Sequence, residues 1–267
     1  MSRTAAYRGA RRYVDGGWVE VERAIPEEAP VVIAPNGAPF AAVMASPSDL
    51  EDLAVGFAVT ERLVGGAGEI SDIKIAAVDE GYEAQLAVPA ARSDALAERR
   101  RAFAARTSCS LCGLEDLDLL LAGGGQVANA LGMPPDRIVA AMAAMPAAQV
   151  LAAESHGVHA AGWAAPDGTL GPVREDVGRH NALDKLIGAL LREGREPAAG
   201  AICLTSRCSI EMVLKAATVG VGLVVAASSP TELAVRAADA AGVTLIAGVR
   251  DGAFDVYAHA GRLEQAT

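Results

Sequence analysis

The first third of the chain alternates apolar and polar residues in short runs, a pattern typical of β-strands. One stretch differs, because apolar residues recur there at helical spacing from Leu50 toward Leu63. Ser46 or Ser48 precedes this stretch and Gly65 follows it, which predicts a helix with a serine N-cap. The predicted strands are 18–25, 31–34, 39–44, 73–78 and 82–88. This part is therefore expected to be rich in β structure with one helix.

The second half alternates helical patterns with short continuous apolar runs. Such runs between helices are typical of a sheet that is covered on both faces. The predicted helices are 135–155, with a break near Pro146, and 178–191, 209–219 and 231–241. The predicted strands are 158–164, 169–174, 201–204, 223–227, 243–248 and 254–257. The order of helix, β-hairpin and repeated helix–strand units indicates an α/β domain.

A segment of different character separates the two halves. Residues 93–105 have a helical pattern, residues 107–113 read Thr-Ser-Cys-Ser-Leu-Cys-Gly, and glycines occupy positions 123–125. Because consecutive glycines give a flexible break, we place the domain boundary there. The expected domains are residues 1–124, a β-rich domain that ends in the Cys-x-x-Cys loop, and residues 125–267, an α/β domain.

Charge and composition narrow the class of function. The 267 residues are 52% hydrophobic, and 33 acidic residues against 23 basic ones give a formal net charge of −10. Such an acidic chain is repelled by phosphate backbones, so general nucleic-acid binding is disfavoured. No apolar stretch approaches the roughly 20 residues that span a bilayer, and the N-terminus lacks the apolar run of a secretory signal. We therefore expect a cytoplasmic protein without membrane contact, whose thiols are kept reduced.

Cys109 and Cys112 are the sharpest local signal. Two thiols at this spacing can share a metal ion, form a disulfide or relay sulfur as a persulfide. A structural zinc ion normally needs four ligands, and the remaining cysteines, Cys203 and Cys208, do not form a second Cys-x-x-Cys pair. A redox pair usually opens a helix directly after a strand, and that context is absent. The small polar neighbours favour the sulfur relay, with an incidental pair of cysteines as the alternative.

A second group of polar residues occupies positions 174–185, where a predicted strand leads into an amphipathic helix. It includes His180 and Asn181. Open α/β sheets bind ligands at the carboxyl ends of their strands. His180 can donate a hydrogen bond, act as a general acid or ligate a metal, and Asn181 can bind an amide or a base edge. A histidine that merely starts the helix or packs in the core is an equal alternative.

Three more polar segments follow predicted strands at what should be the same sheet edge. Ser206 and Arg207 precede one helix, Ser229 and Thr231 precede the next, and Arg250 follows a later strand. Free backbone N–H groups at helix starts attract anions, although serine and threonine there can also serve only as caps. Four such segments at one edge predict a phosphate-bearing, nucleotide-like ligand.

Together these motifs resemble the formate dehydrogenase accessory sulfurtransferase family, FdhD. The resemblance rests on the Cys-x-x-Cys-Gly loop at 109–113 and on the specific run Glu-Asp-Val-Gly-Arg-His-Asn-Ala-Leu-Asp-Lys at 175–185. It continues through Ser206-Arg207, segments 211–217 and 229–231, and Arg250, covering the chain from about residue 56 onward. The family fold implies a cytidine-deaminase-like, three-layer αβα second domain with a mixed sheet, beside a smaller β-rich α+β N-terminal domain.

The resemblance implies a function. Family members take persulfide sulfur from a cysteine desulfurase and pass it to the bis(molybdopterin guanine dinucleotide) molybdenum cofactor of formate dehydrogenase. On this chain, Cys109 is implied to be the persulfide carrier and Cys112 its helper or second sulfur site. The implied cofactor-binding residues are His180, Asn181, Ser206, Arg207, Ser229, Thr231, Gly248, Val249, Arg250, Asp251, Gly252 and Ala253. We expect no metal bound directly by the protein, and a homodimer that embraces the pseudo-symmetric cofactor.

The chain departs from the family pattern at two places. Ser206 stands where the family commonly has the glycine of a Ser-Gly-Arg arrangement, and Arg62 stands where the family has the glycine of Thr-Glu-Gly. Because serine is bulkier than glycine, the first change can alter how closely a phosphate approaches the backbone.

Two other functions compete with sulfur transfer. A zinc-dependent deaminase-like hydrolase would use His180 and Cys208 at two helix starts, but Ala182 replaces its expected glutamate and one thiol ligand is missing. A non-catalytic molybdenum-cofactor chaperone would keep the sheet-edge site and tolerate the loss of Cys109. The client enzyme, molybdenum- or tungsten-dependent, stays open at this level.

Overall fold

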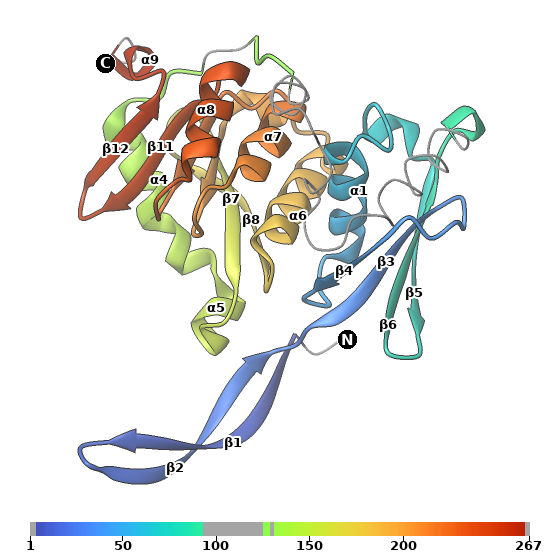
Figure 1. Ribbon diagram of the computed structural model, residues 1–267, viewed down its shortest axis with the longest axis vertical. Helices are drawn as coiled ribbons and strands as arrows, with labels where there is room; N and C mark the ends of the chain where they lie inside the picture. Colours follow the sequence, from blue (N-terminus) through green and yellow to red (C-terminus); the bar gives the residue numbers. More distant parts are fainter. Residues whose placement is uncertain (1–3, 93–124, 129–130, 265–267) are drawn as a thin grey trace.

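The computed structural model describes residues 4–92, 125–128 and 131–264. These residues form three β-sheets, and helices cover two of them (Figure 1). The predicted helix at 93–105, the pair Cys109 and Cys112, and most of the predicted boundary at 123–125 lie outside the described residues. Within the described ranges, no helix is long and apolar enough to cross a membrane.

A four-stranded sheet and one helix form the smaller unit. The strand order is β4-β3-β6-β5, with β3 and β6 parallel and the other neighbours antiparallel. The elements are β3 (Ala29–Pro35), β4 (Ala41–Ala45), α1 (Leu50–Thr60), β5 (Asp72–Val78) and β6 (Gly81–Ala87), with 3-10 turns at Ala67–Glu69 and Ala90–Arg92. Buried residues such as Ile33, Leu53 and Phe57 form a separate core between helix and sheet. The predicted β-rich character of this part is confirmed.

The start of α1 corrects a prediction. Asp49 is the N-cap residue, with a left-handed backbone (φ 51°) and no side-chain capping bond, so the predicted serine cap was wrong. Ser46 instead bonds across to the other unit. Its hydroxyl accepts from the Val177 N–H at 3.1 Å, and its own N–H donates to Asp176 Oδ2 at 2.9 Å. A tertiary contact thus overrides the local capping preference.

A long antiparallel ribbon stands apart from both larger sheets (Figure 1). It consists of β1 (Ala5–Val14) and β2 (Gly17–Pro26), which we call the arm. The predicted strand at 18–25 is β2, whereas β1 was not predicted. Asp15 and Gly16 both have positive φ values, 49° and 82°, as a tight two-residue hairpin turn requires.

The larger unit contains a six-stranded mixed sheet with the order β12-β11-β10-β9-β7-β8. Strands β9, β10 and β11 are parallel, while β7 and β12 run antiparallel to their neighbours. The strands are β7 (His159–Ala164), β8 (Leu170–Asp176), β9 (Ala201–Leu204), β10 (Leu223–Ala226), β11 (Thr244–Arg250) and β12 (Ala253–Ala258). All six predicted strands are therefore confirmed.

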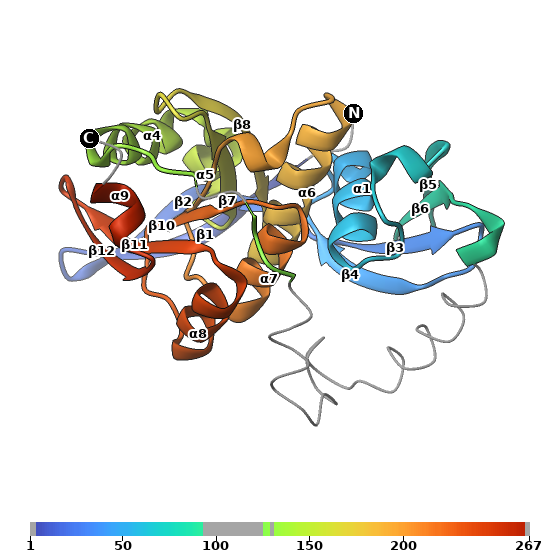
Figure 2. The ribbon, with the colours of Figure 1, turned by 90° about the horizontal axis from the view of Figure 1, so that it is seen from above.

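Helices cover both faces of this sheet (Figure 2). They are α4 (Pro135–Ala148), α5 (Val150–Ser155), α6 (Arg179–Arg192), α7 (Ile210–Thr218), α8 (Glu232–Ala241) and α9 (Gly261–Glu264), with a 3-10 turn at Pro197–Ala199. Within β9, Ile202 and Leu204 pack in the core with α6, α7 and α8, while Ala201 and Cys203 pack on the opposite face with α4. The mixed α/β fold is confirmed, as is the helix break near Pro146. The cytidine-deaminase likeness and the domain bounds stay predictions.

Helices α1 and α6 join the two units in backbone contact. A Cβ atom added to Gly56 would lie 1.8 Å from the Asp184 carbonyl oxygen, and one added to Gly188 would lie 1.9 Å from the Asp52 carbonyl oxygen. No side chain fits at either position, so these two glycines set the separation of the helices. The close crossing brings the polar residues around it within reach of one another.

Candidate functional site

The carboxyl ends of several strands meet at one edge of the six-stranded sheet. Parallel pairing aligns the ends of β9, β10 and β11, and β8 ends at the same edge because its last residue, Asp176, pairs with His159 at the start of β7. The loops after β9 and β10 also touch, since Thr231 N–H donates to the Cys208 carbonyl at 3.0 Å. The predicted gathering of polar loops at one edge is therefore present.

Three helices begin at this edge, namely α6, α7 and α8. Thr231 caps α8, because its hydroxyl accepts from the Ala234 N–H at 3.2 Å. Ser209 precedes α7 without making a capping bond, and its buried hydroxyl has no hydrogen-bond partner among the described residues. Helix starts present free N–H groups and a partial positive charge, so this edge suits an anion.

Charged side chains converge where α6 and α7 begin. His180 Nε2 lies 2.5 Å from Glu211 Oε2, and this contact connects the start of α6 with the start of α7. Burial, and then the nearby positive charges of Arg179 and His180, lower the pKa of His159 below its ordinary value. The Arg179 Nε atom is buried without a hydrogen-bond partner in the described part of the chain. His159, Arg179 and Glu211 were not among the predicted site residues.

The loops after β9 and β10 present exposed polar groups. Arg207 and Ser229 are exposed, so each can contact a bound molecule. Ser206 is buried, and its hydroxyl donates to the Arg207 carbonyl at 2.9 Å. Ser206 thus shapes the loop rather than presenting its side chain to solvent.

The predicted stretch from Gly248 to Ala253 forms the end of the β11–β12 hairpin. Gly248, Arg250, Asp251, Gly252 and Ala253 are exposed, while Val249 is partly buried against the core. The Gly248 N–H donates to the Ser228 carbonyl at 3.4 Å, which places the hairpin beside the β10 loop. Asp251 and Gly252 have positive φ values, 51° and 78°, so they make a tight turn.

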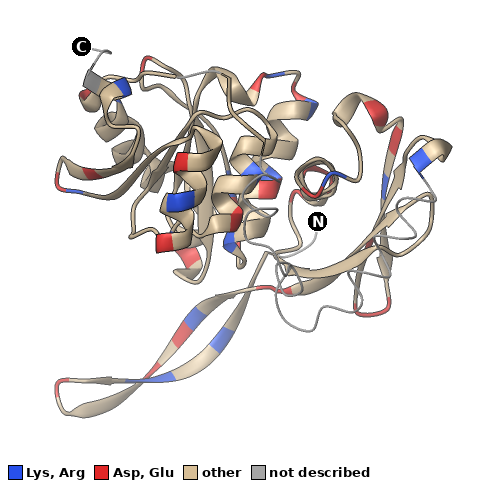
Figure 3. Cartoon of the chain, turned by 45° about the horizontal axis from the view of Figure 1, so that its top comes forward, with Lys and Arg blue, Asp and Glu red and all other residues tan. Residues whose placement is uncertain are grey.

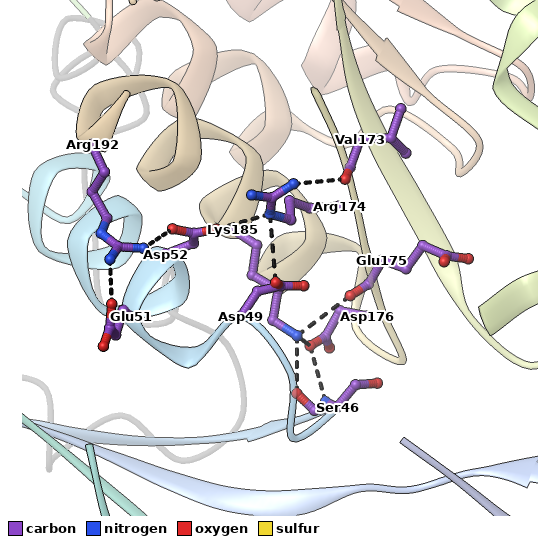
Figure 4. A network of polar contacts seen from close by, with 10 residues as sticks. All are labelled: Ser46, Asp49, Glu51, Asp52, Val173, Arg174, Glu175, Asp176, Lys185 and Arg192. Atoms are coloured by element: carbon purple, nitrogen blue, oxygen red, sulfur yellow. Dashed lines mark hydrogen bonds and ion pairs between the residues drawn. The ribbon is translucent and has the colours of Figure 1, made fainter. Parts of the chain in front are cut away.

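Much of the run 174–185 connects the two units, as Figure 4 shows. Lys185 is fully buried; its Nζ lies 2.6 Å from Asp176 Oδ2 and donates to the Ser46 carbonyl at 2.9 Å. Asn181 Nδ2 donates to the Met44 carbonyl at 2.7 Å and to Asp176 Oδ1 at 3.1 Å. The amide of Asn181 is therefore engaged within the protein rather than turned toward a ligand.

Two further polar clusters hold α1 against α6. Arg174 and Arg192 both pair with Asp52, Arg174 at 2.8 Å (Figure 4). Lys215 Nζ lies 2.9 Å from Asp184 Oδ2 and also bonds Thr60 and Glu61. Burial by itself lowers the pKa of Lys215, but the carboxylates of Asp184 and Glu61 raise it above its ordinary value. The ammonium group therefore stays charged in the interior.

The departure at Arg62 acquires a physical meaning in the structure. Arg62 has a left-handed backbone with φ of 57°, the conformation that glycine adopts without steric cost. The glycine that the family resemblance implies here would adopt this backbone without strain, whereas arginine adopts it at a steric cost.

Cys203 and Cys208 are buried in the two cores of the larger unit. Burial raises the pKa of each thiol to about 12, so neither is a nucleophile near neutral pH. Among the described residues, no group of three or more His, Cys, Asp and Glu side chains is arranged to hold a metal ion. The zinc-hydrolase hypothesis, which required His180 and Cys208 as ligands, is not favoured.

Comparison with known sequences identifies the family. A family model described as the FdhD/NarQ family matches residues 26–264. The chain belongs to the FdhD/NarQ family. The sulfur carrier protein FdhD of Cupriavidus necator is 44% identical over 240 residues, which cover 90% of this chain and 83% of the relative. The FdhD protein of Brucella melitensis is 44% identical over 248 residues, covering 92% of both chains.

A solved structure extends the FdhD/NarQ relationship to the fold. It is described as a formate dehydrogenase accessory protein from Desulfotalea psychrophila. The two folds superpose with a TM-score of 0.76 at 25% sequence identity, covering 98% of this chain and 100% of the other. The resemblance drawn from the sequence motifs is confirmed at the level of the family.

Proposed function

We propose that this chain is a sulfur carrier that takes persulfide sulfur from a cysteine desulfurase and passes it to a molybdenum cofactor. The observation that carries the proposal is the extensive identity to proteins named sulfur carrier protein FdhD, in a chain that has the Cys109-x-x-Cys112 pair. The buried Cys203 and Cys208 are unsuited to the task, which leaves Cys109 and Cys112 as the working thiols.

The sulfur chemistry needs both cysteines. The Cys109 thiolate attacks the outer sulfur of the donor persulfide, the donor S–S bond breaks, and the donor leaves as a thiolate. Cys109 then holds the persulfide. Attack by the Cys112 thiolate on the inner sulfur forms a Cys109–Cys112 disulfide and releases sulfide to the acceptor. Cellular thiols afterwards reduce the disulfide and restore the carrier.

The acceptor is an anionic dinucleotide cofactor, which we place at the carboxyl edge of the six-stranded sheet. Its phosphates would lie against the starts of α7 and α8 and the side chain of Arg207, with Arg250 at the far end of the same edge. This arrangement supports an anion site on a chain whose net charge is −10. The cofactor enters as substrate, so the protein needs no metal of its own.

The decisive experiment measures persulfide formation on Cys109. The purified chain is incubated with a cysteine desulfurase and cysteine, and peptides are analysed for a mass increase of one sulfur. We expect the label on Cys109, its absence in Cys109→Ala, and its accumulation in Cys112→Ala because release is blocked. No persulfide on either cysteine with an active donor would reject sulfur transfer and favour the cofactor chaperone.

The sheet-edge site is tested separately with guanosine diphosphate as the probe. Arg207→Gln should weaken binding roughly 10- to 150-fold, since a hydrogen bond from a charged donor contributes about 1.5–3 kcal/mol. Arg195→Gln is the matched control, because exposed Arg195 follows the opposite end of α6. Equal weakening by both substitutions would indicate non-specific attraction to the nucleotide. Formate dehydrogenase as client and a homodimer stay predictions, to be checked by client activation and sedimentation.

A further inference from the structure

The arm has two chemically different faces. Its register pairs Arg8 with Arg23 and Tyr13 with Trp18 without a bulge, so side chains of even-numbered β1 residues share a face with odd-numbered β2 residues. Figure 3 shows basic positions on both strands of the projecting ribbon, and acidic positions on β2 and at the turn. The register places Arg8, Arg12 and Arg23 on one face of the arm. It places Arg11, Glu20 and Glu22 on the opposite face.

One face pairs its arginine with a carboxylate of the arm. The Arg11 guanidinium lies 3.2 Å from Glu20 and 5.2 Å from the centre of the Trp18 ring, and Trp18 also packs edge-on against Tyr13. At the base of the arm, the Tyr7 hydroxyl donates to Glu154 of α5. The arginine and the aromatic rings of this face therefore have partners within the protein.

The other face, which we call the cationic face, has no such acidic partner among the described residues, although Arg8 donates to the carbonyl of the neighbouring Tyr7 at 3.3 Å. It carries Arg8, Arg12 and Arg23 among Val14, Val19 and Ile25, and it contains no Asp or Glu. No carboxylate in the described part of the chain pairs with any of the three arginines, whose side chains are exposed. Arg8 and Arg23 lie directly opposite each other, an arrangement that destabilises a strand pair unless an anion is present.

Apolar groups on the cationic face indicate what kind of anion it accepts. Val14, Val19 and Ile25 are 37%, 44% and 47% exposed, which is unfavourable for side chains that have nothing to cover them. Nucleic acid would neutralise the arginines through its phosphates, but a phosphate backbone offers no aliphatic surface to cover Val14, Val19 and Ile25. The same face of a second copy would set arginine against arginine. An acidic polypeptide with aliphatic side chains matches both the charge and the apolar surface.

The arm is held out in a fixed direction by its base. Pro26 packs against Gly157, where an added Cβ would lie only 2.9 Å from the proline ring, and Glu27 N–H donates to the Thr4 carbonyl at 2.8 Å. A two-stranded ribbon without further support is marginally stable in water, so covering one face would stabilise it. The contacts at its base hold the arm in place, and its cationic face stays exposed. Both features suit a segment that binds another protein.

We infer that the cationic face of the arm docks an acidic, aliphatic segment of a protein partner. The arginines pair with its carboxylates, and Val14, Val19 and Ile25 contact its apolar side chains. This docking does not depend on the chemistry of Cys109, so it stands or falls separately from the proposed sulfur transfer.

The test measures binding of a fluorescein-labelled ten-residue peptide that alternates Glu and Val, by fluorescence anisotropy with the full chain. Arg12→Gln combined with Arg23→Gln should raise the Kd at least tenfold. Arg11→Gln combined with Arg236→Gln removes the same charge from the opposite face of the arm and from exposed Arg236 of α8, and should leave the Kd within about twofold. A peptide alternating Lys and Val should not bind.

Three results would overturn the inference. The first is an unchanged Kd in the Arg12→Gln, Arg23→Gln chain. The second is tighter binding of a single-stranded oligonucleotide than of the acidic peptide at 0.15 M salt, roughly the physiological ionic strength, which would assign the face to nucleic acid. The third is self-association in sedimentation that the same two substitutions abolish, which would assign it to a second copy. Persulfide loading of Cys109 by excess desulfurase should be the same in both double variants, so a failure of sulfur transfer is recognised independently.

Discussion

Lys185 shows how a single residue of a recognisable motif can serve the fold. Its ammonium group is fully buried against Asp176 and the Ser46 carbonyl, so it connects α6 to the segment before α1. Asn181 and Asp184 of the same motif also bond within the protein. The motif that identifies the family is thus largely an internal support, and His180 is its member at the sheet edge with a partner on α7.

We predict that Lys185→Met lowers the free energy of unfolding by about 3–5 kcal/mol, because it leaves the Asp176 carboxylate buried without its counter-charge. Urea denaturation followed by circular dichroism measures the change. Arg195→Gln, which removes an exposed pair with Glu193, should cost less than about 1 kcal/mol. Comparable losses in the two variants would contradict the assigned role. Adding Asp176→Leu to Lys185→Met should recover part of the stability.

We predict that His159 makes stability depend on pH in the weakly acidic range. Its folded-state pKa is lowered from the ordinary 6.5 by burial and by Arg179 and His180, so the fold favours neutral His159. The contribution of His159 to the free energy of unfolding is fully present above pH 6.5. It is lost as the pH falls from 6.5 through the lowered pKa. His159→Gln should flatten the fall in urea midpoint below pH 6.5, whereas His156→Asn should keep the native slope. An identical slope in His159→Gln would exclude this origin.

At the scale of elements, the α1–α6 crossing determines how the two units meet. Gly56 and Gly188 allow backbone contact, and the clusters around Asp52, Asp176 and Asp184 then close across it. Glycine is unfavourable inside a helix. Its occurrence at both positions of this crossing is therefore explained by the close contact between the helices and not by helix propensity. The arrangement also fixes where α6 begins, and hence where His180 lies.

We predict that Gly188→Ala lowers the free energy of unfolding by about 1–3 kcal/mol, although alanine is the better helix former. The added Cβ would overlap the Asp52 carbonyl, forcing the helices apart. Thermal unfolding gives the measurement. Gly66→Ala, where an added Cβ meets nothing within 4 Å, should change stability by less than about 0.5 kcal/mol. A neutral Gly188→Ala would show that the crossing can widen without cost.

At the scale of the whole molecule, the cysteines divide by environment. Cys203 packs in the core between the sheet and α4, and Cys208 in the core with α6, α7 and α8. Both are inaccessible in the folded protein, so only unfolding exposes them. Neither buried cysteine therefore suits the exchange chemistry that we propose for Cys109 and Cys112.

We predict that a chain with Cys109→Ala and Cys112→Ala reacts with iodoacetamide at pH 8 no faster than it unfolds. A thiol pKa of about 12 leaves only roughly one thiolate in ten thousand at that pH, and burial excludes the reagent as well. Mass spectrometry follows the labelling, and the same chain in urea should label at both cysteines within minutes. Rapid labelling without urea would show that one core opens.

The sequence by itself determined most of the elements and the family. The hydrophobic pattern located every strand of the six-stranded sheet, because the apolar runs between the helices are too short to form helices themselves. It missed β1, where half of the apolar residues are alanine and the pattern is interrupted by Arg8, Arg11 and Arg12. The Asp15-Gly16 pair was a signal for that hairpin. The roles of Cys109 and Cys112 stay predictions, since both lie outside the described residues.

Only the tertiary structure decided which polar residues share a site and which hold the fold. Sequence order could not show that Ser46 bonds Asp176 rather than capping α1, or that Asn181 is engaged by Met44. These contacts join residues more than 100 positions apart, and no local preference encodes them. His159 likewise reaches the sheet edge only because β7 runs antiparallel to β8. Periodicity reports the burial of each element, whereas the partners of a buried charge depend on how the elements pack.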